Sequence, residues 1–183
     1  MRKLVDVEKT MLTKKFARDV KRYQHLIENL HKVDVSKDEV FQRIYNGFFQ
    51  LRRNDAYRAK HYEFLERNKA NDTIEFKEIL VFLSSIQNSV EASFATKMLS
   101  IIRPKAPVWD SKVLDKLNLK KPKMNSPRRI EETFEVYERI CAWYEDFFAR
   151  AQFKEWIELF DKHYPNSGID SVKKVDFVLW QMD

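Results

Sequence analysis

The chain has 183 residues, and its 44% hydrophobic and 34% charged residues are typical of a soluble folded protein and exclude a disordered one. Its two glycines argue against many-turned β folds and glycine-rich phosphate loops. Its single cysteine, Cys141, excludes an internal disulfide and metal sites built on several thiolates.

Other absences narrow the class further. The four histidines show no metal-ligand spacing, so we expect neither a metal nor a cofactor. The first residues lack a signal-peptide pattern, and no window approaches 18 uncharged apolar residues. We therefore expect a cytoplasmic protein that does not span a membrane.

Helical periodicity begins in the first half of the chain. Ser36–Glu39 has the form of a capping box, and Asp72 and Thr73 are placed to cap a second helix. Apolar residues follow each of these sites at helical spacing: Val40, Phe41, Ile44, Tyr45 and Phe48 after the first, and Phe76, Ile79, Leu80, Leu83 and Ile86 after the second.

The middle of the chain predicts two further helices joined by a proline-bracketed elbow. A polar turn at residues 87–90 precedes a helix that begins around Glu91 and ends before Pro104. The elbow, Arg103–Pro107, leads to a helix over Ser111–Leu117 that opens on Asp110.

The last third predicts three helices. One runs from about Arg128 into Phe148, the second is marked by apolar residues over 153–160, and Val172–Trp180 forms the third. Strand-like alternation is nearly absent and no repeat is present, so we predict an all-α fold of seven to nine helices. We interpret the polar loop Lys120–Pro127 as joining two helical lobes of a single domain, residues 1–183.

Positive charge is concentrated in one segment. Residues 97–129 contain ten basic and two acidic residues, a formal charge of +8, whereas the rest of the chain sums to −2. Such concentration favours a polyanionic partner, nucleic acid above all. The alternative is a solvated basic face that binds no ligand.

Two stretches of the chain have the form of a known motif. One is Ser89–Leu99 (SVEASFATKML), and the other is Pro107–Val113 (PVWDSKV). They resemble the hairpin with its following helix, and the proline–apolar–Asp entry into the next helix, of the helix-hairpin-helix DNA glycosylase superfamily, in particular a bacterial 8-oxoguanine-glycosylase-like branch. The resemblance implies a two-lobed fold in which residues 74–117 form a degenerate helix-hairpin-helix and catalytic-aspartate unit. It also implies a DNA duplex with a damaged base as partner, and excision by N-glycosidic bond cleavage.

The resemblance implies a catalytic role for one aspartate. Asp110 would stabilise the positive charge that develops on the sugar as the base leaves, or position the nucleophile. Some superfamily members use a nucleophilic lysine after the hairpin, but Ser93 stands at that place here and Lys97 lies one turn further on. Lys97 is therefore a displaced nucleophile, a phosphate contact or a surface residue. A monofunctional glycosylase that uses Asp110 and water is the expected enzyme.

The resemblance and the charge also imply DNA contacts. The hairpin backbone at Ser89 would meet a phosphate, although Glu91 would repel it and the usual hairpin glycines are missing. Trp109 would stack on a base or ribose, or belong to the core. The remaining expected contacts are Ser93, Arg103, Lys105 and Lys112.

Three alternatives stay open. Asp110 is a plain helix cap in the first of them, because Asp before a helix is common. In the second, the protein is a non-catalytic descendant of the superfamily that binds nucleic acid. In the third, it is a helical interaction module whose basic segment meets an acidic protein.

Overall fold

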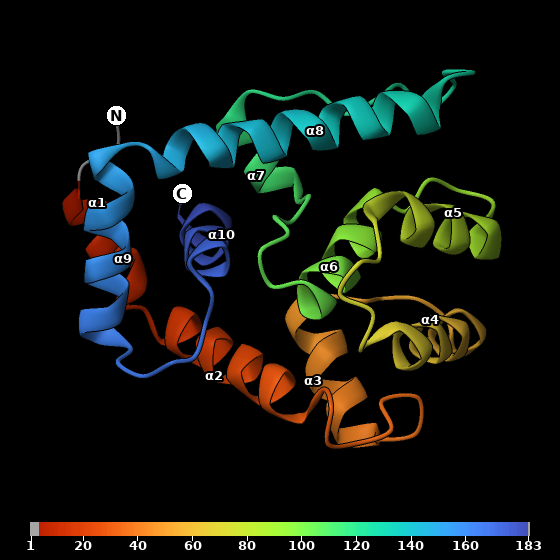
Figure 1. The fold of residues 1–183 in the computed structure, drawn as a ribbon, viewed down its shortest axis with the longest axis horizontal. Helices are drawn as coiled ribbons and strands as arrows, with labels where there is room; N and C mark the ends of the chain where they lie inside the picture. The colour runs from red at the N-terminus through yellow and green to blue at the C-terminus, as the bar shows by residue number, and fades with distance from the viewer. Residues whose placement is uncertain (1–3, 183) are drawn as a thin grey trace. The chain divides into compact units, whose positions relative to one another are not determined.

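The computed structural model describes residues 4–182, which form ten helices and no strand (Figure 1). The predicted all-α class is confirmed, and the helices number ten where seven to nine were expected. None of the described helices is both long and apolar enough to cross a membrane.

The chain divides into two compact units that we describe separately. The terminal unit combines Met1–Arg18 with Pro104–Asp183, and the central unit is Asp19–Arg103. The division therefore falls at the start of the elbow, and the loop Lys120–Pro127, expected to join two lobes, lies inside the terminal unit. The segment 74–117 has residues in both units.

A single threonine explains part of the extra helix count. The N-terminal helical run is interrupted between α1 (Leu4–Met11) and α2 (Lys14–Asn29). The Thr13 hydroxyl accepts the backbone N–H of Phe16 at 3.1 Å, which is the geometry of a new helix start. No glycine or proline marks this break, so periodicity alone does not reveal it.

The central unit contains four further helices: α3 (Glu39–Phe49), α4 (Asp55–Asn68), α5 (Phe76–Gln87) and α6 (Ala92–Ile102). Its core is rich in aromatic rings, including buried Tyr23, Phe41, Tyr45, Phe48, Phe49, Tyr57 and Tyr62. Helix α6 is buried on most of its faces and packs against α5. A helix that is apolar nearly all round belongs inside a fold, so α6 is the centre of this unit.

The N-terminal caps of α3 and α5 are not the residues that the sequence predicts. Helix α3 is capped by Asp38, which accepts the Phe41 N–H at 2.6 Å, because the Ser36 hydroxyl instead bonds Asp34 at 2.5 Å. Helix α5 begins with a capping box of Glu75 and Glu78 rather than at Asp72 or Thr73. The Thr73 hydroxyl bonds Asn71 at 2.8 Å in the turn before the helix. Local side-chain bonds in turns thus compete with capping.

The terminal unit contains α7 (Ser111–Leu117), α8 (Arg129–Phe148), α9 (Ala151–His163) and α10 (Ser171–Gln181), together with α1. Helix α10 is the central element, since it contacts α1, α7 and α9 (Figure 1). Its buried residues include Val172, Val175, Phe177, Val178 and Leu179. The expected bounds of α7, α8, α9 and α10 agree with the structure to within a few residues.

Candidate nucleic-acid interface

The basic segment is exposed along the elbow, α7 and the loop before α8. Residues 104–129 of the terminal unit hold eight basic and two acidic residues. Six of the basic side chains are exposed: Lys105, Lys112, Lys120, Lys121, Lys123 and Arg128. A cluster of this kind presents a positive potential to an anion approaching from solvent.

Most of these cations have no acidic partner among residues 4–182. Lys121 donates to the Ser111 hydroxyl at 2.7 Å, and Arg128 pairs with Glu135 at 3.2 Å on the exposed start of α8. The remaining four, Lys105, Lys112, Lys120 and Lys123, form no ion pair with any residue between 4 and 182. Their charge is therefore available to a bound anion.

Asp110 is the N-cap of α7. Its Oδ1 accepts the backbone N–H of Lys112 at 2.9 Å, and its side chain is half-buried at the start of the helix. The expectation that Asp110 caps the helix is confirmed, and its catalytic role stays a prediction.

A buried polar cluster holds the backbone just before Asp110. The Val108 N–H donates to Asp176 Oδ1 at 3.5 Å, and Asp176 also accepts from Lys173 Nζ at 2.7 Å and from the Tyr144 hydroxyl. Burial raises the pKa of Asp176 above its ordinary value, while these donors oppose the rise. The cluster holds the backbone at Val108, two residues before Asp110. The sequence gives no sign of it, because Asp176 lies 68 residues from Val108.

Trp109 packs into the terminal unit and is 4% exposed. Almost no part of its indole ring is exposed to solvent, as expected if Trp109 belongs to the core. A stacking role would require the ring to leave this packing.

The hairpin between α5 and α6 lies in the central unit and is internally neutralised. Glu91, 6% exposed, accepts from Arg53 Nη2 at 2.9 Å through both carboxylate oxygens, and the Ser89 hydroxyl donates to Glu91 Oε1 at 2.5 Å. Asn88 takes the left-handed conformation with φ of 49°, which asparagine tolerates better than most residues that are not glycine. Arg53 therefore compensates the charge expected to repel phosphate, and sequence reasoning missed it because it is 38 residues away.

Lys97 is buried in α6 at 7% exposure. Its ammonium donates to the Phe49 carbonyl at 3.1 Å and lies 5.5 Å from the centre of the Phe94 ring. The surface alternative for Lys97 is therefore wrong. Lys97 belongs to the central unit and Asp110 to the terminal unit.

The other expected contacts differ in their surroundings. Ser93 is half-buried in the first turn of α6, and its carbonyl accepts the Thr96 hydroxyl at 3.2 Å. Arg103 is exposed, and its Nη1 donates to the Ile74 carbonyl at 3.0 Å. Of the expected contact residues, Arg103, Lys105 and Lys112 are exposed and form no ion pair in the described chain, and Arg103 is held by its bond to a carbonyl.

Comparison of the chain with protein-family models, with curated proteins and with solved structures gives no match. Among the residues that the structure describes, no three His, Cys, Asp or Glu side chains are grouped to hold a metal ion. The arguments for a function therefore rest on the residues themselves, namely the exposed cations and the capping aspartate.

Proposed function

We propose that this protein binds DNA through the exposed cations of the elbow, α7 and the loop before α8. The observation that carries the proposal is a set of exposed lysines that form no ion pair with the residues the structure describes, namely Lys105, Lys112, Lys120 and Lys123. Lysines that neutralise phosphates release condensed counterions, which drives binding and makes it depend on salt. The proposal needs only the terminal unit.

A finer proposal adds catalysis at Asp110. The carboxylate opposes positive charge on the sugar while the N-glycosidic bond breaks and the base leaves with the bonding electrons. Water then adds at C1′ and gives up a proton. The position of Asp110 at the start of α7, beside Lys112, supports this role. The burial of Lys97 supports water, rather than this lysine, as the nucleophile.

Binding without catalysis is the second candidate. It is favoured by Trp109 and Lys97, both buried, and by the hairpin, whose Glu91 is occupied by Arg53. These are the groups that the resemblance assigns to base stacking, lyase chemistry and phosphate contact. The two candidates share the same DNA surface and differ only in what Asp110 does.

The DNA-binding proposal is tested by fluorescence anisotropy with a labelled duplex over a range of salt. We expect K120Q/K121Q/K123Q to weaken binding and to reduce the log–log salt slope by up to about three. The matched control is K14Q/K15Q/K154Q, which removes the same charge from exposed lysines of the same unit outside the segment. Equal losses in both triple variants, or no binding at low salt, would contradict the proposal, and a captured acidic protein would then favour an interaction module.

The catalytic proposal is tested on duplexes that carry a panel of damaged bases, with borohydride added to trap any covalent adduct. We expect released base without an adduct, and no release from Asp110→Asn, which keeps the cap and the DNA affinity. Asp170→Asn is the matched control, because Asp170 caps α10 by accepting the Val172 N–H at 2.8 Å. Full release of the base by Asp110→Asn would contradict the catalytic role. No base release from any substrate by the wild type would favour binding alone.

A further inference from the structure

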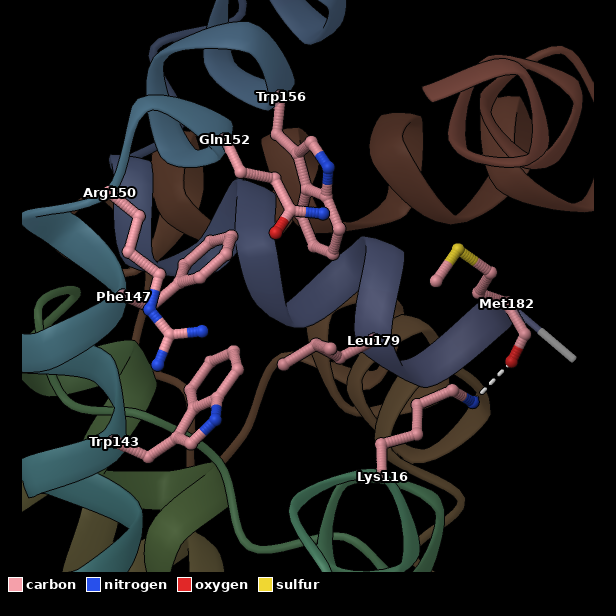
Figure 2. A pocket seen from close by; sticks show the side chains of 8 residues that line it. All are labelled: Lys116, Trp143, Phe147, Arg150, Gln152, Trp156, Leu179 and Met182. Atoms are coloured by element: carbon pink, nitrogen blue, oxygen red, sulfur yellow. Dashed lines mark hydrogen bonds between the residues drawn. The ribbon is translucent and has the colours of Figure 1, made fainter. Parts of the chain in front are cut away.

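A pocket of about 250 Å³ lies among α7, α8, α9 and α10 of the terminal unit. Its lining residues come from all four helices and their ends: Lys116, Trp143, Phe147, Arg150, Gln152, Trp156, Leu179 and Met182 (Figure 2). The volume is slightly below the roughly 300 Å³ at which pockets for drug-sized ligands begin. One planar ring therefore fits inside it, and the rest of a ligand would lie at its edge.

Two indoles are among the lining residues, and Trp143 is the more exposed of the two. Trp143 enters from α8 and Trp156 from α9, and Figure 2 shows their rings on different sides of the pocket. The Trp143 ring stacks on Phe147, with centroids 4.9 Å apart and planes 11° from parallel, so its orientation is held by packing. Flat, pre-oriented aromatic surfaces bind planar rings by stacking without much loss of side-chain freedom.

The polar side chains at the pocket are Lys116, Arg150 and Gln152, and two of them are cationic. Arg150 at one edge uses Nη2 to bond Asp146, which leaves further N–H groups of its guanidinium for a ligand. The Trp156 indole N–H is buried and has no acceptor within the described part of the chain. No acidic residue is among those that line the pocket. A ligand with acceptor atoms and negative charge complements such a wall.

We propose that this pocket binds a nucleotide, with the base against Trp143 and the phosphate beside Arg150. The choice of a nucleotide over other aromatic anions rests on the proposed DNA binding. The same chemistry comes from two sources, a free mononucleotide or an unstacked nucleotide within a strand. The pocket gives the terminal unit a place for a base that has left its stack.

The test uses the whole protein and 2′-deoxyadenosine 5′-monophosphate, followed by quenching of tryptophan fluorescence and by calorimetry. We expect Arg150→Gln to weaken binding about tenfold or more, since it removes a charge-assisted contact. Arg139→Gln, on an exposed part of α8 outside the pocket, is the matched control and should bind as the wild type does. Trp143→Phe keeps a ring on Phe147 and should lose most of the quenching. Deoxyadenosine and inorganic phosphate should each bind more weakly than the nucleotide.

Binding that is absent at millimolar nucleotide, or equal in Arg150→Gln and wild type, overturns the inference. Displacement of the nucleotide by a single-stranded oligonucleotide assigns the pocket to strands, and failure of displacement assigns it to free nucleotides. The two proposals fail separately. Nucleotide binding without DNA binding removes the proposed function and keeps the pocket, whereas DNA binding without nucleotide binding does the reverse.

Discussion

The two stretches Ser89–Leu99 and Pro107–Val113 differ in whether their charged side chains are bonded within the fold or exposed to solvent. In the hairpin of the central unit, Glu91 is neutralised by Arg53 and Lys97 is buried against a carbonyl. At the entry to α7 in the terminal unit, Asp110 caps an exposed helix and Lys112 forms no ion pair in the described chain. Charges that are bonded inside a fold are occupied by its own groups, whereas exposed charges without an ion pair can attract an oppositely charged partner. The charges of the hairpin are thus occupied within the central unit, and the α7 entry is the one of the two stretches where we propose DNA binding.

The largest expected effect comes from the buried support beneath the α7 entry. Asp176→Ala leaves the Lys173 ammonium, 2% exposed, without its carboxylate and removes the acceptor for the Val108 N–H. We expect a loss of about 3–5 kcal/mol in the free energy of unfolding. Urea denaturation followed by tryptophan fluorescence measures it, because all four tryptophans lie in the terminal unit.

A double variant provides the control for this loss. Lys173→Met combined with Asp176→Leu removes both charges at once and should recover much of the stability. A loss below about 1 kcal/mol in the single variant would mean that the cluster does not support the elbow.

The next effect is acid sensitivity of the central unit. His61 is fully buried, its Nε2 lies 3.2 Å from the Tyr45 hydroxyl, and burial lowers the pKa of His61 to about 3. Between the ordinary pKa of 6.5 and about 3 the unfolded chain binds a proton that the folded chain does not, so stability falls as pH falls. The expected loss is about 1.4 kcal/mol per pH unit, or roughly 2 kcal/mol at pH 5.

Urea denaturation followed by circular dichroism from pH 7 to pH 5 checks this loss. His61→Phe removes the titrating group and should flatten the profile, whatever its effect at pH 7. If the free energy of unfolding of this variant still fell with pH as in the wild type, groups other than His61 would cause the acid sensitivity.

The hairpin ion pair should contribute less, because Arg53 is 37% exposed and water can solvate it. Glu91→Gln keeps the shape and an acceptor for Ser89 and removes the charge. We expect a cost of about 1 kcal/mol and no gain in DNA affinity. Glu63→Gln, exposed on α4, is the control. A several-fold gain in affinity would show that the hairpin meets phosphate after all, and would break the comparison.

How far the sequence predicts this molecule depends on the range of the interactions. The helices over 111–117, 129–148 and 171–181 follow from periodicity and from local caps such as Asp110, and the sequence places them well. The start of α3 at Asp38 and the break at Thr13 depend on which of several nearby polar side chains bonds the backbone, and pattern alone does not decide that. Boundaries are therefore less predictable than elements.

For the candidate site, too, features that depend on local sequence are predictable and features that depend on distant residues are not. Exposed lysines between 105 and 123 are evident from charge, because a dense basic run cannot be buried. The partners of Glu91, Lys97 and Val108 lie 38 to 68 residues away in the chain. Such pairs form only through tertiary packing, so an isolated lysine in an apolar helix gives no sign that its ammonium is occupied.

A matched pair of lysines provides the sharpest test of the comparison. Lys97→Met and Lys112→Met remove the same charge from the two stretches. Lys112→Met should weaken DNA binding several-fold and lower the log–log salt slope by about one, because an exposed lysine can neutralise a phosphate. Lys97→Met should leave both unchanged and cost about 1–2 kcal/mol of stability, because the buried Phe49 carbonyl loses its donor. Anisotropy titrations at several salt concentrations measure the binding, and urea denaturation measures the stability. An equal drop in affinity for both variants would mean that the buried lysine reaches DNA when it binds, and the hairpin would then rejoin the interface.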